Sequence, residues 1–113
     1  MPKDEDLIRL RHMLDAACKV SEFIQDHERE DLDMDEKLSL SIVRLLEIIG
    51  EAAVNVSEQC KNENVEIPWR QIASTRNRLI HGYFDIDHDI VWKIVTGDLP
   101  DLIAELKKIL PTI

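Results

Sequence analysis

The sequence predicts an all-α protein, an up-and-down helical bundle that forms one domain over residues 1–113. Three observations support this class. Apolar residues recur at steps of three and four along most of the chain, as on the buried face of a helix. No alternating apolar-polar run persists, and the chain has only three glycines and four prolines, so strands are not expected. A chain of 113 residues can form a core without disulfides or a metal.

Four helical segments account for most of the chain. The first covers about residues 3–26, and a charged turn over residues 27–33 follows it with no residue committed to the core. The second helix begins at Met34 or Asp35, and its apolar positions alternate steps of four and three, as in helix-on-helix packing. Further apolar residues widen this surface, so a subunit interface is expected on the second helix.

A polar connector over residues 61–66 leads to a third helix, residues 69–80, in whose first turn Pro68 fits. This helix is predicted to stop at Ile80 or His81, where Gly82 can form a left-handed C-cap. Asp85 or Asp87 caps the last segment. The sequence between Gly97 and Pro100 is expected to kink or break that segment, with Asp98 as a new N-cap, giving four to five helices.

Charge and cysteine content restrict the function. The net charge of −9 opposes binding of nucleic acid over the whole surface, but it permits a small basic cleft and favours a basic partner. Cys18 and Cys60 have no paired spacing, so we expect no disulfide framework, no zinc site and a reducing cytoplasm. No stretch approaches the roughly 18 apolar residues of a membrane span, so no membrane contact is expected.

Arg76 is the most informative residue, because it falls on the apolar arc of the third predicted helix. It lies four residues after Ile72 and four before Ile80, which share one face of a helix. An isolated buried guanidinium is strongly unfavourable, so Arg76 must be paired or functional. Glu47 and Glu51, one turn apart on the second helix, are expected to form ion pairs, and one of them can orient Arg76.

The residues that follow Arg76 suit phosphodiester chemistry. Arg76 offers a planar fork of donors to phosphate. His81 lies near a helix C-terminus, where the dipole favours the protonated ring, and Asn77 can orient it from one turn earlier. Tyr83 adds a hydroxyl and a ring. Because RNA carries its own nucleophile, the 2′-hydroxyl, such a site needs no metal or cofactor. A purely structural role for Arg76 and His81 is the alternative.

Two further groups of side chains, one acidic and one basic, lie near the proposed site in the sequence. Asp85, Asp87, His88 and Asp89 have the composition of a metal site, but apolar residues alternate with them and helix capping explains the acids. Basic residues concentrate around the proposed site, which supports weak contacts to RNA. These weak RNA contacts are assigned to Arg70, Arg78 and Lys93.

The HEPN-domain RNases have a motif that residues 76–84, RNRLIHGYF, closely resemble. The tyrosine two residues after the histidine is characteristic of the HepT toxins, which are paired with MntA-type nucleotidyltransferase antitoxins. Residues 46–53, 67–70 and 91–100 look like further landmarks of the same family in the same order. The resemblance therefore covers essentially the whole chain.

This resemblance implies a HEPN-like bundle that forms a homodimer, with two motifs in a shared cleft that cuts RNA without a metal ion. It implies that Arg76 stabilises the phosphate and His81 acts as general acid/base. Tyr83 would support the site and be the residue that the antitoxin modifies with AMP, which adds bulk and negative charge. The partners would be RNA, the antitoxin and a second copy of the chain, with larger hetero-oligomers left open. The alternative is a non-catalytic HEPN-like scaffold for a nucleotidyltransferase.

Overall fold

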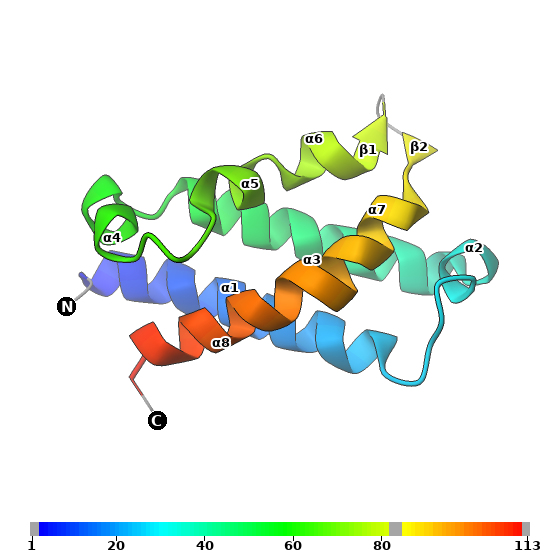
Figure 1. The fold of residues 1–113 in the computed structure, drawn as a ribbon, viewed down its shortest axis with the longest axis horizontal. Coiled ribbons are helices and arrows are strands. Elements are labelled where there is room, and N and C mark those ends of the chain that lie inside the picture. Colours follow the sequence, from blue (N-terminus) through cyan, green and yellow to red (C-terminus); the bar gives the residue numbers. More distant parts are fainter. Residues whose placement is uncertain (1–2, 82–84, 112–113) are drawn as a thin grey trace.

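Two long antiparallel helices, α1 (Asp4–Ile24) and α3 (Glu36–Val54), form the base of the bundle (Figure 1). The computed structural model describes residues 3–81 and 85–111. α1 ends in a turn where Asp26 adopts the left-handed conformation, with φ of 65°. The start predicted for α3 is confirmed, because the Asp35 carboxylate accepts a hydrogen bond from the backbone N–H of Leu38 at 3.1 Å.

Two short helices lie in segments that the sequence predicted to be turn or connector. α2 (Asp31–Met34) follows α1, and α4 (Glu58–Glu63) follows α3. The expectation of no core residue in the first segment is wrong, since Leu32 is 1% exposed. α4 buries Cys60, while Cys18 on α1 is half-buried, and both thiols are free. Each helix places one apolar side chain in the core, a signal too short for a periodic pattern.

A buried carboxylate attaches the start of α1 to α4. Asp6 is 4% exposed and accepts hydrogen bonds from the backbone N–H of Ser57 at 2.8 Å and from its hydroxyl at 2.6 Å. The Ser57 hydroxyl in turn caps α4 by accepting from the N–H of Cys60. Burial alone would raise the pKa of Asp6, but these hydrogen bonds, with nearby Arg9 and Lys3, outweigh it and lower the pKa.

The last segment is irregular where the sequence predicted it, but without a new N-cap. α7 (His88–Lys93) continues into a π-helical turn, η1 (Ile94–Asp98), and then into α8 (Leu99–Ile109), which crosses the bundle (Figure 1). Asp98 keeps helical dihedral angles and its side chain makes no capping bond, so its predicted role is wrong. Pro100 has no N–H to donate within the helix. The wider π-helical turn accommodates the missing hydrogen bond, and the chain continues as a helix in α8.

The all-α class is confirmed, with one small addition. β1 (Ile80–His81) and β2 (Asp85–Ile86) form an antiparallel pair with Ile80 opposite Ile86. The core lies where α1, α3 and α8 meet, and the wide apolar surface of α3 is used within the subunit, against α1, α2, α5 and α6. Among its fully buried residues are Leu10, Met13, Val20, Leu32, Ile42, Leu46, Leu79, Val91, Val95 and Leu106.

Candidate active site

The third predicted helix is divided in two at Ser74. α5 (Trp69–Ala73) and α6 (Thr75–Leu79) flank this residue, whose dihedral angles are φ −94° and ψ 8°. The Ser74 and Thr75 hydroxyls both donate to the carbonyl of Gln71, at 3.1 and 3.4 Å. In an unbroken helix that carbonyl would accept from the N–H of Thr75, so the hydroxyls compete with the helical bond. A prediction of one continuous helix over residues 69–80 is therefore wrong.

Arg76 does not lie on the buried face of this segment. In α6 it is Thr75 and Leu79 that face inward, at 7% and 0% exposure. The Arg76 side chain is 63% exposed, so its predicted position on a buried stripe is wrong. The question of how a buried guanidinium is compensated does not arise, because the charge faces solvent.

Arg76 is held by one carboxylate from α3. Its Nε donates to Oε2 of Glu47 at 3.2 Å, and Glu47 is only 22% exposed. The prediction that one of the two glutamates orients Arg76 is confirmed for Glu47, while Glu51 pairs with Arg44 at 3.5 Å. Because Nε takes this bond, the four N–H groups on the terminal nitrogens of Arg76 point to no partner among the described residues and can bind an anion.

A hollow of about 130 Å³ lies beside this ion pair. Glu47, Gly50, Val54 and Ala73 line it together with Arg76. A Cβ at Gly50 would lie 3.2 Å from the carbonyl oxygen of Ile72, so glycine allows the end of α5 to approach α3 closely. This close approach places Arg76 on the surface of α3 rather than in a separate loop.

His81 follows α6 in β1, outside the helix. α6 ends at Leu79, and Ile80 has extended dihedral angles of φ −116° and ψ 119°. The proposed one-turn relation between Asn77 and His81 therefore does not hold, because the chain is not helical between them; Asn77 itself is exposed on α6. The backbone of His81 pairs with Asp85. Tyr83 and the predicted C-cap Gly82 lie outside the described residues.

The other basic residues do not form one cluster with Arg76. Arg70, Arg76 and Arg78 line three different hollows. Arg78 is 30% exposed and lies 3.8 Å from the carboxylate of Asp98. Lys93 is exposed on α7. Arg76 and Arg70 nevertheless belong to neighbouring hollows, since Ala73 lines both.

The acidic group around α7 is used for capping and ion pairing. Asp87 accepts a hydrogen bond from the N–H of Ile90 at 3.1 Å, which confirms the predicted cap. Asp89 accepts from Nε of Arg29 at 2.6 Å. Sequence spacing alone would not have separated these roles.

His88 joins the start of α7 to α2 and α3, a role that sequence reasoning missed. Its Nδ1 lies 2.7 Å from Oδ1 of Asp33, and its Nε2 lies 3.0 Å from the hydroxyl of Ser39. His88 and Arg29 lower the pKa of Asp33 through their hydrogen bonds. Ser39 is 3% exposed, so its hydroxyl is a buried contact of His88 and not an accessible nucleophile. It anchors α7 directly after β2, the strand that pairs with His81.

The fold and site define an all-α bundle with a solvent-facing arginine and a histidine five residues later. A family model described as "Ribonuclease HepT-like" matches residues 13–109, and the chain belongs to this family. The resemblance seen in the sequence is thereby confirmed. None of the helices in residues 3–81 and 85–111 is long and apolar enough to cross a bilayer.

Individual relatives match over most of their length. A protein of Thermococcus cleftensis named "Probable ribonuclease HepT" is 38% identical over 100 residues, covering 88% of this chain and 91% of its own. A presumed RNase of Methanocaldococcus jannaschii is 34% identical over 113 residues, covering 100% and 93%. A presumed RNase of Caldanaerobacter subterraneus is 35% identical over 101 residues, covering 89% and 90%. No solved structure gives a significant match.

Proposed function

We propose that this protein is an endoribonuclease toxin that cuts RNA without a metal ion, with Arg76 and His81 as its catalytic residues. One observation carries the proposal. The Arg76 guanidinium is oriented by a single carboxylate, faces solvent, and keeps its terminal nitrogens available beside a hollow. A single ion pair that is open to solvent contributes little to stability, so the pair with Glu47 does not by itself give Arg76 a strong structural role. Membership of a ribonuclease family supports RNA as the substrate.

The chemistry requires few groups. The 2′-hydroxyl of RNA attacks the adjacent phosphorus and the 5′-oxygen leaves, which yields a 2′,3′-cyclic phosphate and a 5′-hydroxyl. One proton leaves the 2′-oxygen and one is gained by the 5′-oxygen. His81 serves one of these transfers, and Arg76 stabilises the charge on the phosphate oxygens. Because a single imidazole cannot accept and donate in the same step, a second His81, from the partner subunit, serves the other.

A dimer that unites two such sites is supported by an outer stripe of α3 that is exposed except at Glu47, which is 22% exposed. The stripe follows steps of four and three residues and consists of Leu40, Arg44, Glu47, Glu51 and Val54. It is self-complementary about Glu47: in an antiparallel pair of α3 helices, Leu40 meets Val54 of the partner subunit and Arg44 meets Glu51 of the partner subunit. Leu40 and Val54 are 52% and 56% exposed in the single chain. A two-fold axis near Glu47 would place both copies of Arg76 in one cleft.

The proposed control of the toxin is AMP transfer to Tyr83 by a nucleotidyltransferase antitoxin. The two strands that flank residues 82–84 in sequence are paired, with His81 opposite Asp85, so the polypeptide on either side of Tyr83 is fixed. An AMP group on a tyrosine two residues from His81 adds negative charge where the RNA phosphate binds, and so blocks the site. Intact-mass measurement after co-expression with the antitoxin tests this: we expect the added mass on wild-type chain and not on Tyr83→Phe.

The proposed activity is tested by cleavage of single-stranded RNA or transfer RNA in EDTA. We expect cleavage by the wild-type chain, cyclic-phosphate ends on the products, and a loss of roughly 10²–10⁴-fold in rate for His81→Ala. His12→Ala is the matched control, since His12 is exposed on α1 and should retain full activity. Complete loss in EDTA that Mg²⁺ restores would contradict the metal-independent mechanism. No cleavage under any condition would leave the non-catalytic scaffold as the function.

A further inference from the structure

A second, larger hollow adjoins the Arg76 site between α4 and α5. Its volume is about 910 Å³, and its lining includes Lys61, Trp69, Arg70 and Ser74. Ala73 lines both this hollow and the one at Arg76, so the two form neighbouring parts of one surface. We call the larger one the Trp69 groove. It combines an aromatic ring, two cations and polar side chains with the apolar Val65 and Pro68, a composition that suits the bases and phosphates of a single strand.

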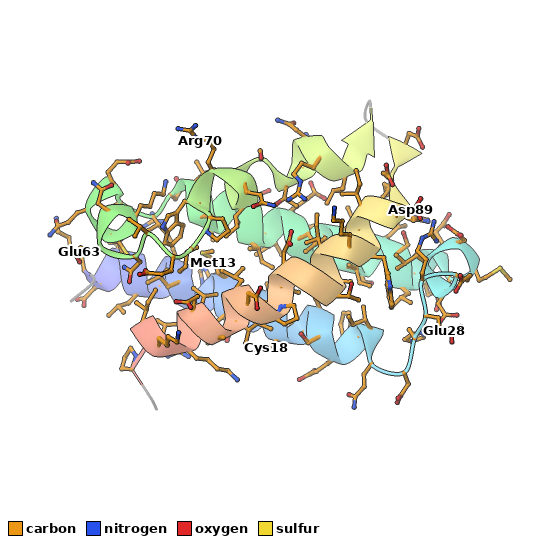
Figure 2. The ribbon with its side chains drawn as sticks, in the orientation of Figure 1. Met13, Cys18, Glu28, Glu63, Arg70 and Asp89 are labelled. Carbon is orange, nitrogen blue, oxygen red and sulfur yellow. The ribbon has the colours of Figure 1, made fainter. Side chains whose placement is uncertain are left out.

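The charge balance of the Trp69 groove is positive in a chain whose net charge is −9. Arg70 is exposed, has no ion pair or hydrogen bond with any described residue through its side chain, and projects outward from α5 (Figure 2). Lys61 lies 3.7 Å from Glu58, whose side chain is 85% exposed. The lining therefore has two cationic side chains and one carboxylate, whose charge is screened by solvent. This arrangement favours an anionic ligand.

Trp69 gives the groove a fixed ring. Its indole N–H donates to the backbone oxygen of Asn64 at 3.0 Å, and the ring is half-buried against the core. The part that the core leaves uncovered lines the groove. Packing against the core is compatible with a second role for Trp69, because an anchored ring loses little entropy when a base stacks on it.

We propose that the Trp69 groove is a subsite for single-stranded RNA, in which Trp69 stacks a base and Arg70 contacts a phosphate next to the cleaved linkage. This inference rests on the proposed ribonuclease function. Arg70 and Arg76 lie on either side of the break at Ser74, and the hollows that they line share Ala73. The two guanidiniums can therefore contact neighbouring nucleotides of one strand. Ser74, at which the helix breaks, lies between them in the sequence and lines the groove.

Binding is measured without cleavage by using the His81→Ala chain and a fluorescein-labelled single-stranded RNA in an anisotropy titration. We expect Arg70→Ala in this background to weaken binding about three- to tenfold and to reduce the slope of log K against log salt by about one. Arg11→Ala is the matched control, because Arg11 lies on α1 and bonds only the carbonyl of Pro111 among the described residues. It should change neither quantity.

Stacking is measured by fluorescence, since the chain has only two tryptophans. With Trp92→Phe in the His81→Ala background, Trp69 is the sole indole, and RNA should quench its emission as a base covers it. With Trp69→Phe instead, Trp92 should keep its emission. If Trp69→Phe fails to fold by circular dichroism, the Trp92→Phe chain alone decides: no quenching at saturating RNA overturns the stacking assignment.

Cleavage kinetics separate this inference from the proposed function. With His81 intact, Arg70→Ala should raise KM for a long RNA and leave its kcat and the cleavage of a dinucleotide unchanged, because the dinucleotide does not reach the groove. Equal KM values for Arg70→Ala and wild type, with an unchanged salt slope, overturn the subsite while the nuclease stands. No cleavage by the wild-type chain overturns the nuclease, whichever binding result is obtained.

Discussion

Replacing Arg76 separates a catalytic arginine from a structural one, because the two roles predict opposite effects on stability and activity. Its only partner among the described residues is Glu47, and the Arg76 side chain is 63% exposed. Ion pairs that are open to solvent contribute about 0–1 kcal/mol, since water and salt screen them. Arg76→Ala should therefore lower the free energy of unfolding by about 1 kcal/mol at most. Such a change leaves nearly all molecules folded.

The expected loss of activity is far larger. Removing a donor that stabilises transition-state charge typically costs about 10²–10³-fold in rate. Arg76→Lys should fall between Arg76→Ala and wild type, because lysine keeps the charge but not the planar fork. Glu47→Ala removes only the group that orients the fork, so we expect a rate loss of roughly two- to fivefold.

A double-mutant cycle makes the comparison quantitative. The unfolding free energy and the cleavage rate are measured for Arg76→Ala, Glu47→Ala and the double variant, by urea titration and by gel assay. We expect a coupling in stability of about 0.2–1 kcal/mol and an Arg76→Ala activity that is no lower when Glu47 is also replaced. The reasoning is refuted if Arg76→Ala costs more than about 2 kcal/mol of stability and activity falls only in proportion to the folded fraction.

Three further predictions concern stability, measured by urea or thermal unfolding. The pKa of Asp6 is lowered in the fold, so its carboxylate contributes fully to the free energy of unfolding above the ordinary value of 3.8. This contribution is lost as pH falls through the folded pKa, and Asp6→Asn should make stability depend less on pH in that acidic range. His88→Ala leaves the buried Ser39 hydroxyl without its partner and should cost about 1–3 kcal/mol, whereas His27→Ala, at an exposed pair, should cost under about 0.5. Asp26→Gly removes the steric cost of the left-handed backbone conformation and should raise the free energy of unfolding by up to about 1 kcal/mol.

The long helices could be predicted because each repeats its apolar spacing over several turns. α1 and α3 have this length, and Asp35 and Asp87 occupy the N-cap positions where carboxylates bond free N–H groups. α2 and α4 are too short for a period to emerge, and their single core residues, Leu32 and Cys60, lie within charged or polar sequence. The β1–β2 pair has two residues a strand and leaves no alternation to detect.

The geometry that the sequence predicted around Arg76 differs from the structure. The ion pair of Arg76 with Glu47 could be predicted from sequence, but the exposure of Arg76 could not, because Thr75 and not Arg76 shares the buried face with Ile72 and Leu79. The adjacent hydroxyls of Ser74 and Thr75 were the available sequence signal for the break between α5 and α6, since such side chains compete for backbone carbonyls. The bonds of His88 to Asp33 and Ser39 join residues 55 and 49 positions apart, which no local pattern reports.

The apparent defect in the third helix is explained by three features acting together. The hydroxyls at Ser74 and Thr75 weaken the helix, Gly50 lets α5 end close to α3, and Glu47 receives the arginine at that surface. On α6 it is Leu79, and not Arg76, that lies in the core. A charged residue on an apolar stripe is a local conflict, and such conflicts concentrate where function competes with regular structure. In this chain the conflict does not arise in the folded state, because Ile72, Thr75 and Leu79 form the buried face and the Arg76 guanidinium faces solvent beside Glu47.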